Sequence, residues 1–291
     1  MSSKEQDLST EDFPILDNHM HLRETGDNVE AVKRFKKSGG THLIISHLPY
    51  HDLRSWDSEG YKPIYERTLK LAERAEKETD VKTFVTLGPY PVDLVQLTDR
   101  VSLERAKKIL IDGMDLAAGY VKEGRAIALG EIGRPHFDVS DDILQASNEI
   151  MKYGMKLAAD IGCPVVLHTE STTPEQCNEL GEMADSVGLD RGKVVKHYSP
   201  PMTSFDKNHG LYPSILARES NIEDAIKGNN RFLLETDYID DPTRPGAVLG
   251  IRNVPKKTRK MFRKGVLSEE DIWKIHKENP EDLFRLVYYL P

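Results

Sequence analysis

The chain has 291 residues, of which 38% are hydrophobic and 30% are charged, and its formal net charge is −8. This composition is typical of a globular protein with a sizeable core, and the acidic balance argues against binding nucleic acid over the whole surface. The chain has no apolar run near the roughly 18 residues of a membrane span and no secretory apolar core at its N-terminus, so we expect a cytoplasmic protein.

Short apolar segments rich in Val, Ile and Leu alternate with longer segments of helical periodicity, which indicates a parallel sheet. The predicted strands, in chain order, are 13–21, 41–48, 81–89, 126–133, 163–170, 193–199, 211–217 and 231–238. The predicted helices are 28–40, 62–80, 102–124, 141–161, one opened by "TTPE" from Thr173, a short one near 222–228, and 268–287. The strand at 211–217 has the weakest signal.

Eight strand–helix units without a Pro/Gly/Ser-rich linker are what a (β/α)8 barrel requires. A doubly wound sheet is the competing architecture, but the glycine-rich turn of a dinucleotide fold is missing after the first strand. We therefore predict an α/β fold, a TIM barrel, with a flexible N-terminal tail over 1–12 and a single domain over 13–291. Cys163 and Cys177 match no zinc motif or disulfide framework, so we expect two small buried side chains.

Metal-capable side chains lie at the carboxyl ends of five predicted strands, where barrel enzymes place their chemistry. In "HMH", the alternation of a strand points both histidines to the same side. The six groups are His19 and His21 on the first strand, Glu131 on the fourth, His168 on the fifth, His197 on the sixth and Asp237 on the eighth. A buried core histidine explains any one of them, but six groups at one end of a barrel indicate a metal site.

Four imidazoles and two carboxylates exceed the roughly three protein ligands of a catalytic zinc ion, so a site for two divalent ions about 3.5–4 Å apart fits better. We expect one ion at His19, His21 and Asp237, the other at His168 and His197, and Glu131 as the bridge. Nitrogen-rich ligation favours zinc or another transition ion over magnesium without deciding which. We expect Zn²⁺, with Mn²⁺ or Mg²⁺ as alternatives. The pair would activate a water molecule, and Asp237 would pass the water's proton to the leaving group.

The ordered set "HMH", "GEIG", "VVLHTE", "VVKHYS" and "ETD" resembles the TatD-like branch of the amidohydrolase superfamily, from Asp17 to about Leu286. "ENPEDLFRL", with Asn279, resembles that family's closing helix. The resemblance implies an amidohydrolase-like, metal-dependent hydrolase with the six groups as ligands, and better-known members are nucleases that cut DNA, commonly from the 3′ end. Segments such as "GEIGRPH" and "ETDYIDDPTRPGAVLG" more closely resemble a mostly archaeal group of TatD-related hydrolases.

Two segments depart from the ordinary TatD pattern, "RPH" after "GEIG" and a long loop after Asp237. We expect substrate contacts from Arg23, Arg134 and Arg244, which can clamp a phosphate or carboxylate, and from His136. Surface ion pairs and an exposed loop histidine are the alternatives.

Three further features are less specific. His47 and His51 flank the end of the second strand, and alternation predicts that Tyr198 turns away from the metals into packing. The stretch 252–265 has seven basic and no acidic residues, so it either guides a polyanion or forms a solvated helix.

Three functions remain open on these residues. The first is hydrolysis of phosphodiester bonds, including those of DNA from the 3′ end. The second is hydrolysis of a small amide, lactone or phosphoester. The third is metal-dependent binding without catalysis. The expected partner is a small-molecule or nucleic-acid substrate, with no membrane and no obligate protein partner.

Overall fold

The computed structural model describes residues 13–49, 57–245 and 247–286. The predicted tail over 1–12 and His51 lie outside these residues. The described strands form one parallel sheet in the order β8-β7-β6-β5-β4-β3-β2-β1-β9. Their bounds are β1 Leu16–His21, β2 His42–Ser46, β3 Lys82–Leu87, β4 Ala128–Gly133, β5 Val165–His168, β6 Val194–Lys196, β7 Tyr212–Leu216, β8 Leu233–Glu235 and β9 Tyr238–Ile239.

The sheet closes on itself through the eighth predicted strand, which is split into β8 and β9. β8 pairs with β7, whereas β9 pairs with β1. Between the two halves, the backbone N–H of Thr236 donates to Asp17 Oδ1 at 2.9 Å and that of Asp237 donates to the His19 carbonyl at 3.0 Å. The first and last predicted strands therefore meet, and the TIM-barrel prediction is confirmed.

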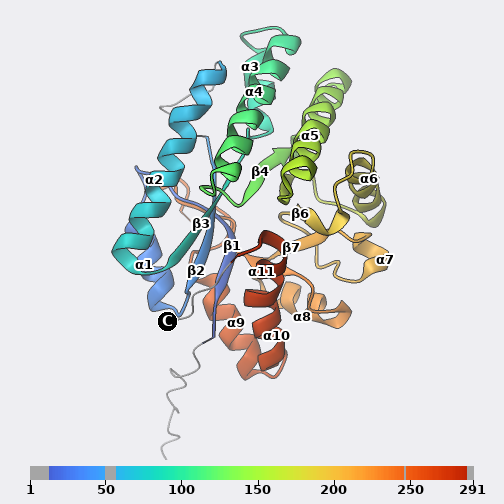
Figure 1. Cartoon of the computed structure of the whole chain (residues 1–291). Helices are drawn as coiled ribbons and strands as arrows, with labels where there is room; N and C mark the ends of the chain where they lie inside the picture. Colours follow the sequence, from blue (N-terminus) through green and yellow to red (C-terminus); the bar gives the residue numbers. More distant parts are fainter. Residues whose placement is uncertain (1–12, 50–56, 246, 287–291) are drawn as a thin grey trace, which may run out of the picture.

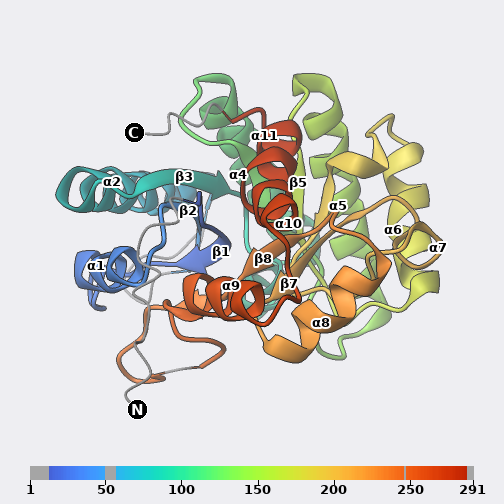
Figure 2. The same ribbon diagram turned by 90° about the horizontal axis from the view of Figure 1, so that it is seen from below.

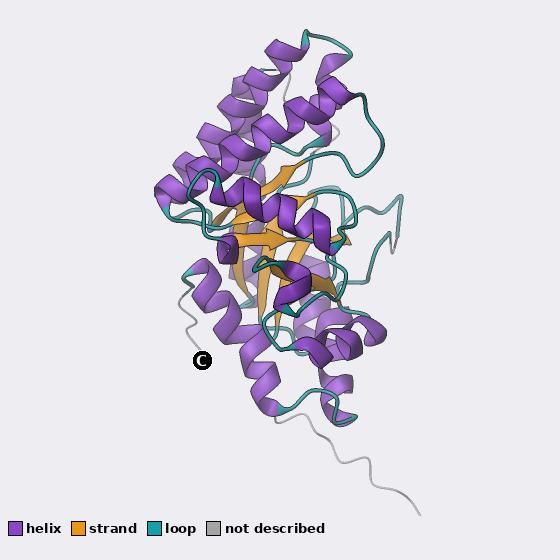
Figure 3. Ribbon diagram, turned by 90° about the vertical axis from the view of Figure 1, so that its right-hand side faces the viewer, coloured by secondary structure: helices purple, strands orange, loops and turns teal. Residues whose placement is uncertain are grey.

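Helices surround the strands on the outside of the barrel (Figures 1 and 3). The α-helices are α1 Val29–Lys37, α2 Tyr61–Thr79, α3 Val92–Thr98, α4 Leu103–Lys122, α5 Asp141–Ile161, α6 Pro174–Asp185, α7 Phe205–Asn208, α8 Glu219–Gly228, α9 Asn253–Arg263, α10 Glu269–Trp273 and α11 Asn279–Phe284. Short 3-10 turns lie at Ser58–Gly60 (η1) and Arg191–Lys193 (η2), and a π-helical turn, η3, spans Lys274–Glu278. None of the described helices is both long and apolar enough to cross a membrane.

The amino-terminal mouth of the barrel is covered by α11, the last helix of the described residues. The predicted helix over 268–287 is interrupted by the π-helical turn, so α11 lies across the strands when the barrel is seen from below (Figure 2). Leu283 and Phe284 pack there against Leu16, Val166 and other interior side chains at the strand starts. Because one mouth is filled with apolar side chains, only the carboxyl end is left for a polar site.

Candidate metal centre

All six predicted ligands meet at the carboxyl end of the barrel, around the carboxylate of Glu131. Glu131 Oε1 lies 2.5 Å from His19 Nε2, 3.4 Å from His21 Nε2 and 3.9 Å from His197 Nε2. Its second oxygen, Oε2, lies 3.0 Å from His168 Nδ1. Each oxygen therefore faces a different set of imidazoles.

Asp237 completes the ring of donors from the opposite side. Its Oδ1 lies 3.3 Å from His21 Nε2 and 4.0 Å from His19 Nε2. The rings of His19 and His197 stack with centroids 3.9 Å apart. The centre thus brings together groups that are up to 218 positions apart in the sequence.

The two glycines of "GEIG" allow β4 to approach β5 closely enough for this meeting. A Cβ on Gly130 would lie 2.6 Å from Val166 Cβ, and one on Gly133 would lie 2.0 Å from the carbonyl oxygen of His168. Gly133 also has a φ of +144°, which side-chain-bearing residues rarely adopt. Glu131 and His168 can be neighbours because no side chain separates the strands.

The outward-facing ring nitrogen of each histidine has its own partner. His19 Nδ1 lies 2.9 Å from Ser46 Oγ, and His21 Nδ1 donates to the Ser46 carbonyl at 3.1 Å. The remaining two contacts are His197 Nδ1 to Glu235 Oε1 and His168 Nε2 to His136 Nδ1, both at 2.9 Å. Such outer partners fix the tautomer and orientation of metal-binding histidines. Each of the four imidazoles thus turns one nitrogen toward Glu131 and contacts an outer partner through the other. This set of donors fits a pair of divalent metal ions.

The pKa values in this cluster follow from burial opposed by unlike charge. Burial alone would raise the pKa of Glu131, but the imidazoles of His168 and His19 lower it well below its usual range. Burial lowers the pKa of His19, yet the charge and hydrogen bond of Glu131 raise it to about 9. Burial would likewise raise the pKa of Asp237, and His197 lowers it. The carboxylates are thus held in the ionised form that binds cations.

A cavity of about 510 Å³ opens above the six groups. Glu131, Asp237 and three of the histidines form its floor, and Leu48, Tyr90, Ile239 and Val248 form an apolar part of the wall. Its volume lies in the range of small-molecule sites.

Two of the predicted substrate residues line this cavity, Arg244 and His136. The side chain of Arg244 is 56% exposed, and its Nε donates to Asp241 Oδ2 at 3.1 Å. Tyr198 also lines the cavity and is 44% exposed, so the predicted packing of its ring is wrong. Its φ of +52° breaks the strand alternation, and its backbone N–H donates to Glu235 Oε1 at 2.8 Å.

Arg134 and Arg23 are not among the residues that line this cavity, and their contact with substrate stays a prediction. The guanidinium of Arg134 is buried and donates to Glu170, Glu179 and Asn148 at 2.6–3.1 Å. Arg23 is also buried, and its Nη1 lies 3.5 Å from Asp241 Oδ2. The bonds of Arg134 join the loop after β4 to α5, α6 and the loop after β5. His47 packs its buried ring against Tyr65 and is likewise absent from the cavity wall.

Sequence reasoning missed Ser46 and Glu235, which hold three of the histidines from behind. A signal for Glu235 existed, because it precedes Asp237 by two positions and therefore points to the same side of a strand. Ser46 is the last residue of β2, and no sequence pattern around it indicates a role in the site.

The basic stretch 252–265 forms α9. Lys257, Lys260 and Lys264 all donate to the carboxylate of Glu219 at 2.6–2.9 Å, so part of its charge is neutralised against α8.

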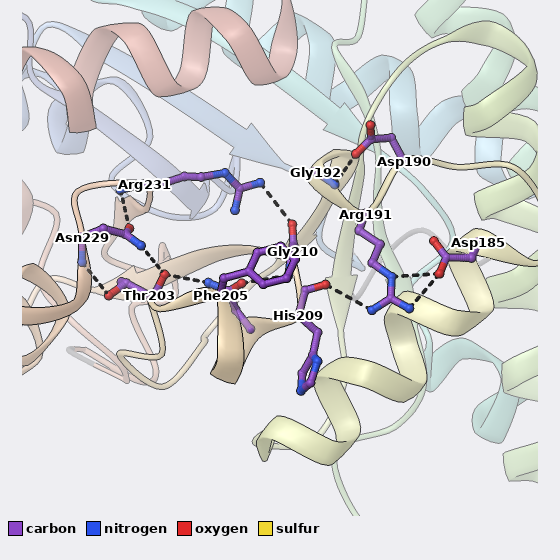
Figure 4. Close-up of a pocket in the computed structure, with 11 residues that line it drawn as sticks. Asp185, Asp190, Arg191, Gly192, Thr203, Phe205, His209, Gly210, Asn229 and Arg231 are labelled. Carbon is purple, nitrogen blue, oxygen red and sulfur yellow. Dashed lines mark hydrogen bonds and ion pairs between the residues drawn. The ribbon is translucent and has the colours of Figure 1, made fainter.

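A second pocket of about 510 Å³ lies at the amino ends of β6, β7 and β8 (Figure 4). There Arg191 donates to Asp185, and Arg231 donates to the Gly210 carbonyl, so both guanidinium groups are paired within the pocket wall. It contains none of the six predicted ligands.

A sequence profile described as "TatD related DNase" matches residues 16–285. The chain belongs to the TatD family. A relative, the uncharacterized protein MJ1127 of Methanocaldococcus jannaschii, is 43% identical over 275 residues, which are 94% of this chain and 96% of the relative. The family resemblance seen in the ordered motifs is confirmed.

Solved structures share the fold at low sequence identity. YJJV, a TatD homologue from Escherichia coli K12, is 19% identical with a TM-score of 0.65, covering 95% of this chain and 100% of that one. A TatD-like protein from Archaeoglobus fulgidus is 18% identical with a TM-score of 0.61, covering 93% and 100%. The phosphotriesterase homology protein from E. coli, complexed with phosphate in its active site, is 12% identical with a TM-score of 0.61, covering 94% and 99%. These likenesses establish a barrel shared with TatD and phosphotriesterase-like proteins.

Proposed function

We propose that this TatD-family protein is a hydrolase that uses two divalent metal ions, with Zn²⁺ as the first choice, to cleave phosphodiester bonds with water. The convergence of four imidazoles and two carboxylates, five of these six groups lining one cavity, carries this proposal. His19, His21 and Asp237 would hold one ion, His168 and His197 the other, and Glu131 both. When bound, the ions supply Lewis acidity and an activated water molecule.

The protein's own residues account for the rest of the chemistry. The carboxylate of Asp237 reaches the cavity and accepts the proton that the attacking water loses, then delivers it to the leaving group. Ser46 and Glu235 keep the imidazoles in place while this happens.

The cavity wall supports an anionic substrate. Arg244 lines it with a largely exposed side chain, and a guanidinium pairs with phosphate through two hydrogen bonds. DNA, attacked from its 3′ end, is the polymer substrate that the family implies, and a phosphotriesterase homology protein of the same fold holds phosphate in its active site.

A second candidate is hydrolysis of a small amide, lactone or phosphoester. Two observations favour it, the small-molecule volume of the cavity and the pairing of Lys257, Lys260 and Lys264 with Glu219. A basic helix whose lysines are occupied offers less charge to guide a polyanion.

The deciding assay offers the protein, reconstituted with Zn²⁺ or Mn²⁺, labelled single-stranded DNA beside bis(p-nitrophenyl) phosphate and a panel of lactones and amides. Asp237→Asn should abolish turnover, and Asp206→Asn, a matched change at an exposed residue of α7, should leave it intact. DNA shortening that Asp237→Asn removes supports the proposal. Turnover confined to lactones or amides would replace it by the second candidate. A fully metal-loaded protein without any turnover would overturn both in favour of a binding protein.

A further inference from the structure

His168 makes a second contact that no other predicted ligand makes, a hydrogen bond to another histidine. Its Nδ1 lies 3.0 Å from Glu131 Oε2, and its Nε2 lies 2.9 Å from His136 Nδ1. The two rings meet edge to face, with centroids 5.1 Å apart. His19, His21 and His197 are held by oxygen atoms instead.

This contact is compatible with only one arrangement of protons in a metal centre. A neutral imidazole has one N–H and one lone pair, and only the lone pair binds a metal. If Nδ1 of His168 faces the metal position, its Nε2 carries the proton and donates to His136 Nδ1. His136 must then carry its own proton on Nε2.

The loop that carries His136 lies against the backbone of His168 and is anchored by the side chain of Arg134. Gly133 lies so close to the His168 carbonyl that only a hydrogen fits at its Cα, and the Arg134 N–H donates to that same carbonyl at 3.0 Å. The Arg134 guanidinium is fixed by three side chains of α5, α6 and the loop after β5, and Pro135 restricts the backbone before His136. The ring of His136 is thereby directed at its neighbour.

We propose that His136 is a positioning residue that fixes His168 in the tautomer and orientation needed to bind the second metal ion through Nδ1. The proposal rests on the metal-dependent function proposed above. It also explains the "RPH" departure from the ordinary TatD pattern: the arginine anchors the loop and the histidine holds the ligand.

Metal affinity tests this role without any substrate. His136→Asn keeps an acceptor, since its Oδ1 is attached at the same place as Nδ1, whereas His136→Phe keeps a ring but removes the acceptor. His209→Asn is the control, because it removes a histidine from the pocket of Figure 4, and its left-handed φ of +50° suits asparagine. Zn²⁺ is titrated into each metal-free protein against a chromogenic chelator, and the two equivalents are fitted separately.

We expect His136→Phe to weaken one equivalent by about 10- to 100-fold and to leave the other unchanged. His136→Asn and His209→Asn should bind both equivalents like the wild type. Equal binding by His136→Phe and the wild type would overturn the inference while leaving the proposed function intact. Equal losses in His136→Phe and His136→Asn would also overturn it, because the acceptor would then be irrelevant. A wild-type protein that binds no metal would instead refute the proposed function itself.

Discussion

Replacing Gly133 by alanine should destabilise the protein far more than the same change at an ordinary left-handed glycine. The added Cβ would lie 2.0 Å from the His168 carbonyl oxygen, whereas ordinary contact begins at 3.4 Å, so the ends of β4 and β5 would have to part by roughly 1.4 Å. That movement breaks the Arg134 N–H···O=C hydrogen bond of 3.0 Å, whose loss costs about 1–3 kcal/mol in a buried place. The φ of +144° adds about 1–3 kcal/mol of backbone strain for a residue with a Cβ.

Together these contributions reduce the free energy of unfolding by about 4 kcal/mol, which corresponds to about 7 °C in Tm at an unfolding entropy of roughly 2.1 cal/mol/K per residue. Gly265→Ala is the matched control, since Gly265 has a φ of +70° and no atom within 4 Å of its added Cβ, so the expected loss is about 1 kcal/mol. Urea denaturation of both variants, metal-free, gives the comparison. Equal losses in the two variants would refute the close approach of β4 to β5.

Two further predictions concern groups below and beside the centre. Burial lowers the pKa of His276 from 6.5 to about 4, so the native protein holds fewer protons than the unfolded chain and loses roughly 3 kcal/mol as the pH falls from 6.5 to 4. His276→Asn keeps an acceptor for the Leu16 N–H and should lack this loss of stability. Urea denaturation of both proteins at pH 6.5 and pH 4 checks the prediction, and an equal loss in the variant and the wild type would contradict it. Glu235→Gln removes the charge 2.9 Å from His197 Nδ1 and should weaken Zn²⁺ binding about 10- to 100-fold in a chelator competition, whereas unchanged binding would deny Glu235 its supporting role.

Local sequence signals predicted the elements of the barrel well. Ser102, Thr173 and Ser268 were expected to begin helices, and each accepts a hydrogen bond from the backbone N–H three residues later. Even the weakest strand, 211–217, is present as β7, and both cysteines are buried and free. These features depend on hydrophobic periodicity and helix capping, which are determined by residues close together in the sequence.

The features that the sequence did not predict lie where distant partners decide the geometry. Asp237 has a φ of +47°, which splits the eighth strand so that one half can pair with β7 and the other with β1. Tyr198 turns into the cavity because its backbone N–H donates a hydrogen bond to the Glu235 carboxylate. Arg134 is a loop anchor because three acceptors from other segments surround it. No pattern within a single segment contains that information.

The metal content of the protein tests the central claim most directly. Crystals of the Zn²⁺-reconstituted protein, measured on both sides of the zinc absorption edge, should show two anomalous peaks flanking the carboxylate of Glu131, and elemental analysis should give two zinc ions per chain. A single peak away from Glu131, or none at full zinc exposure, would contradict the account.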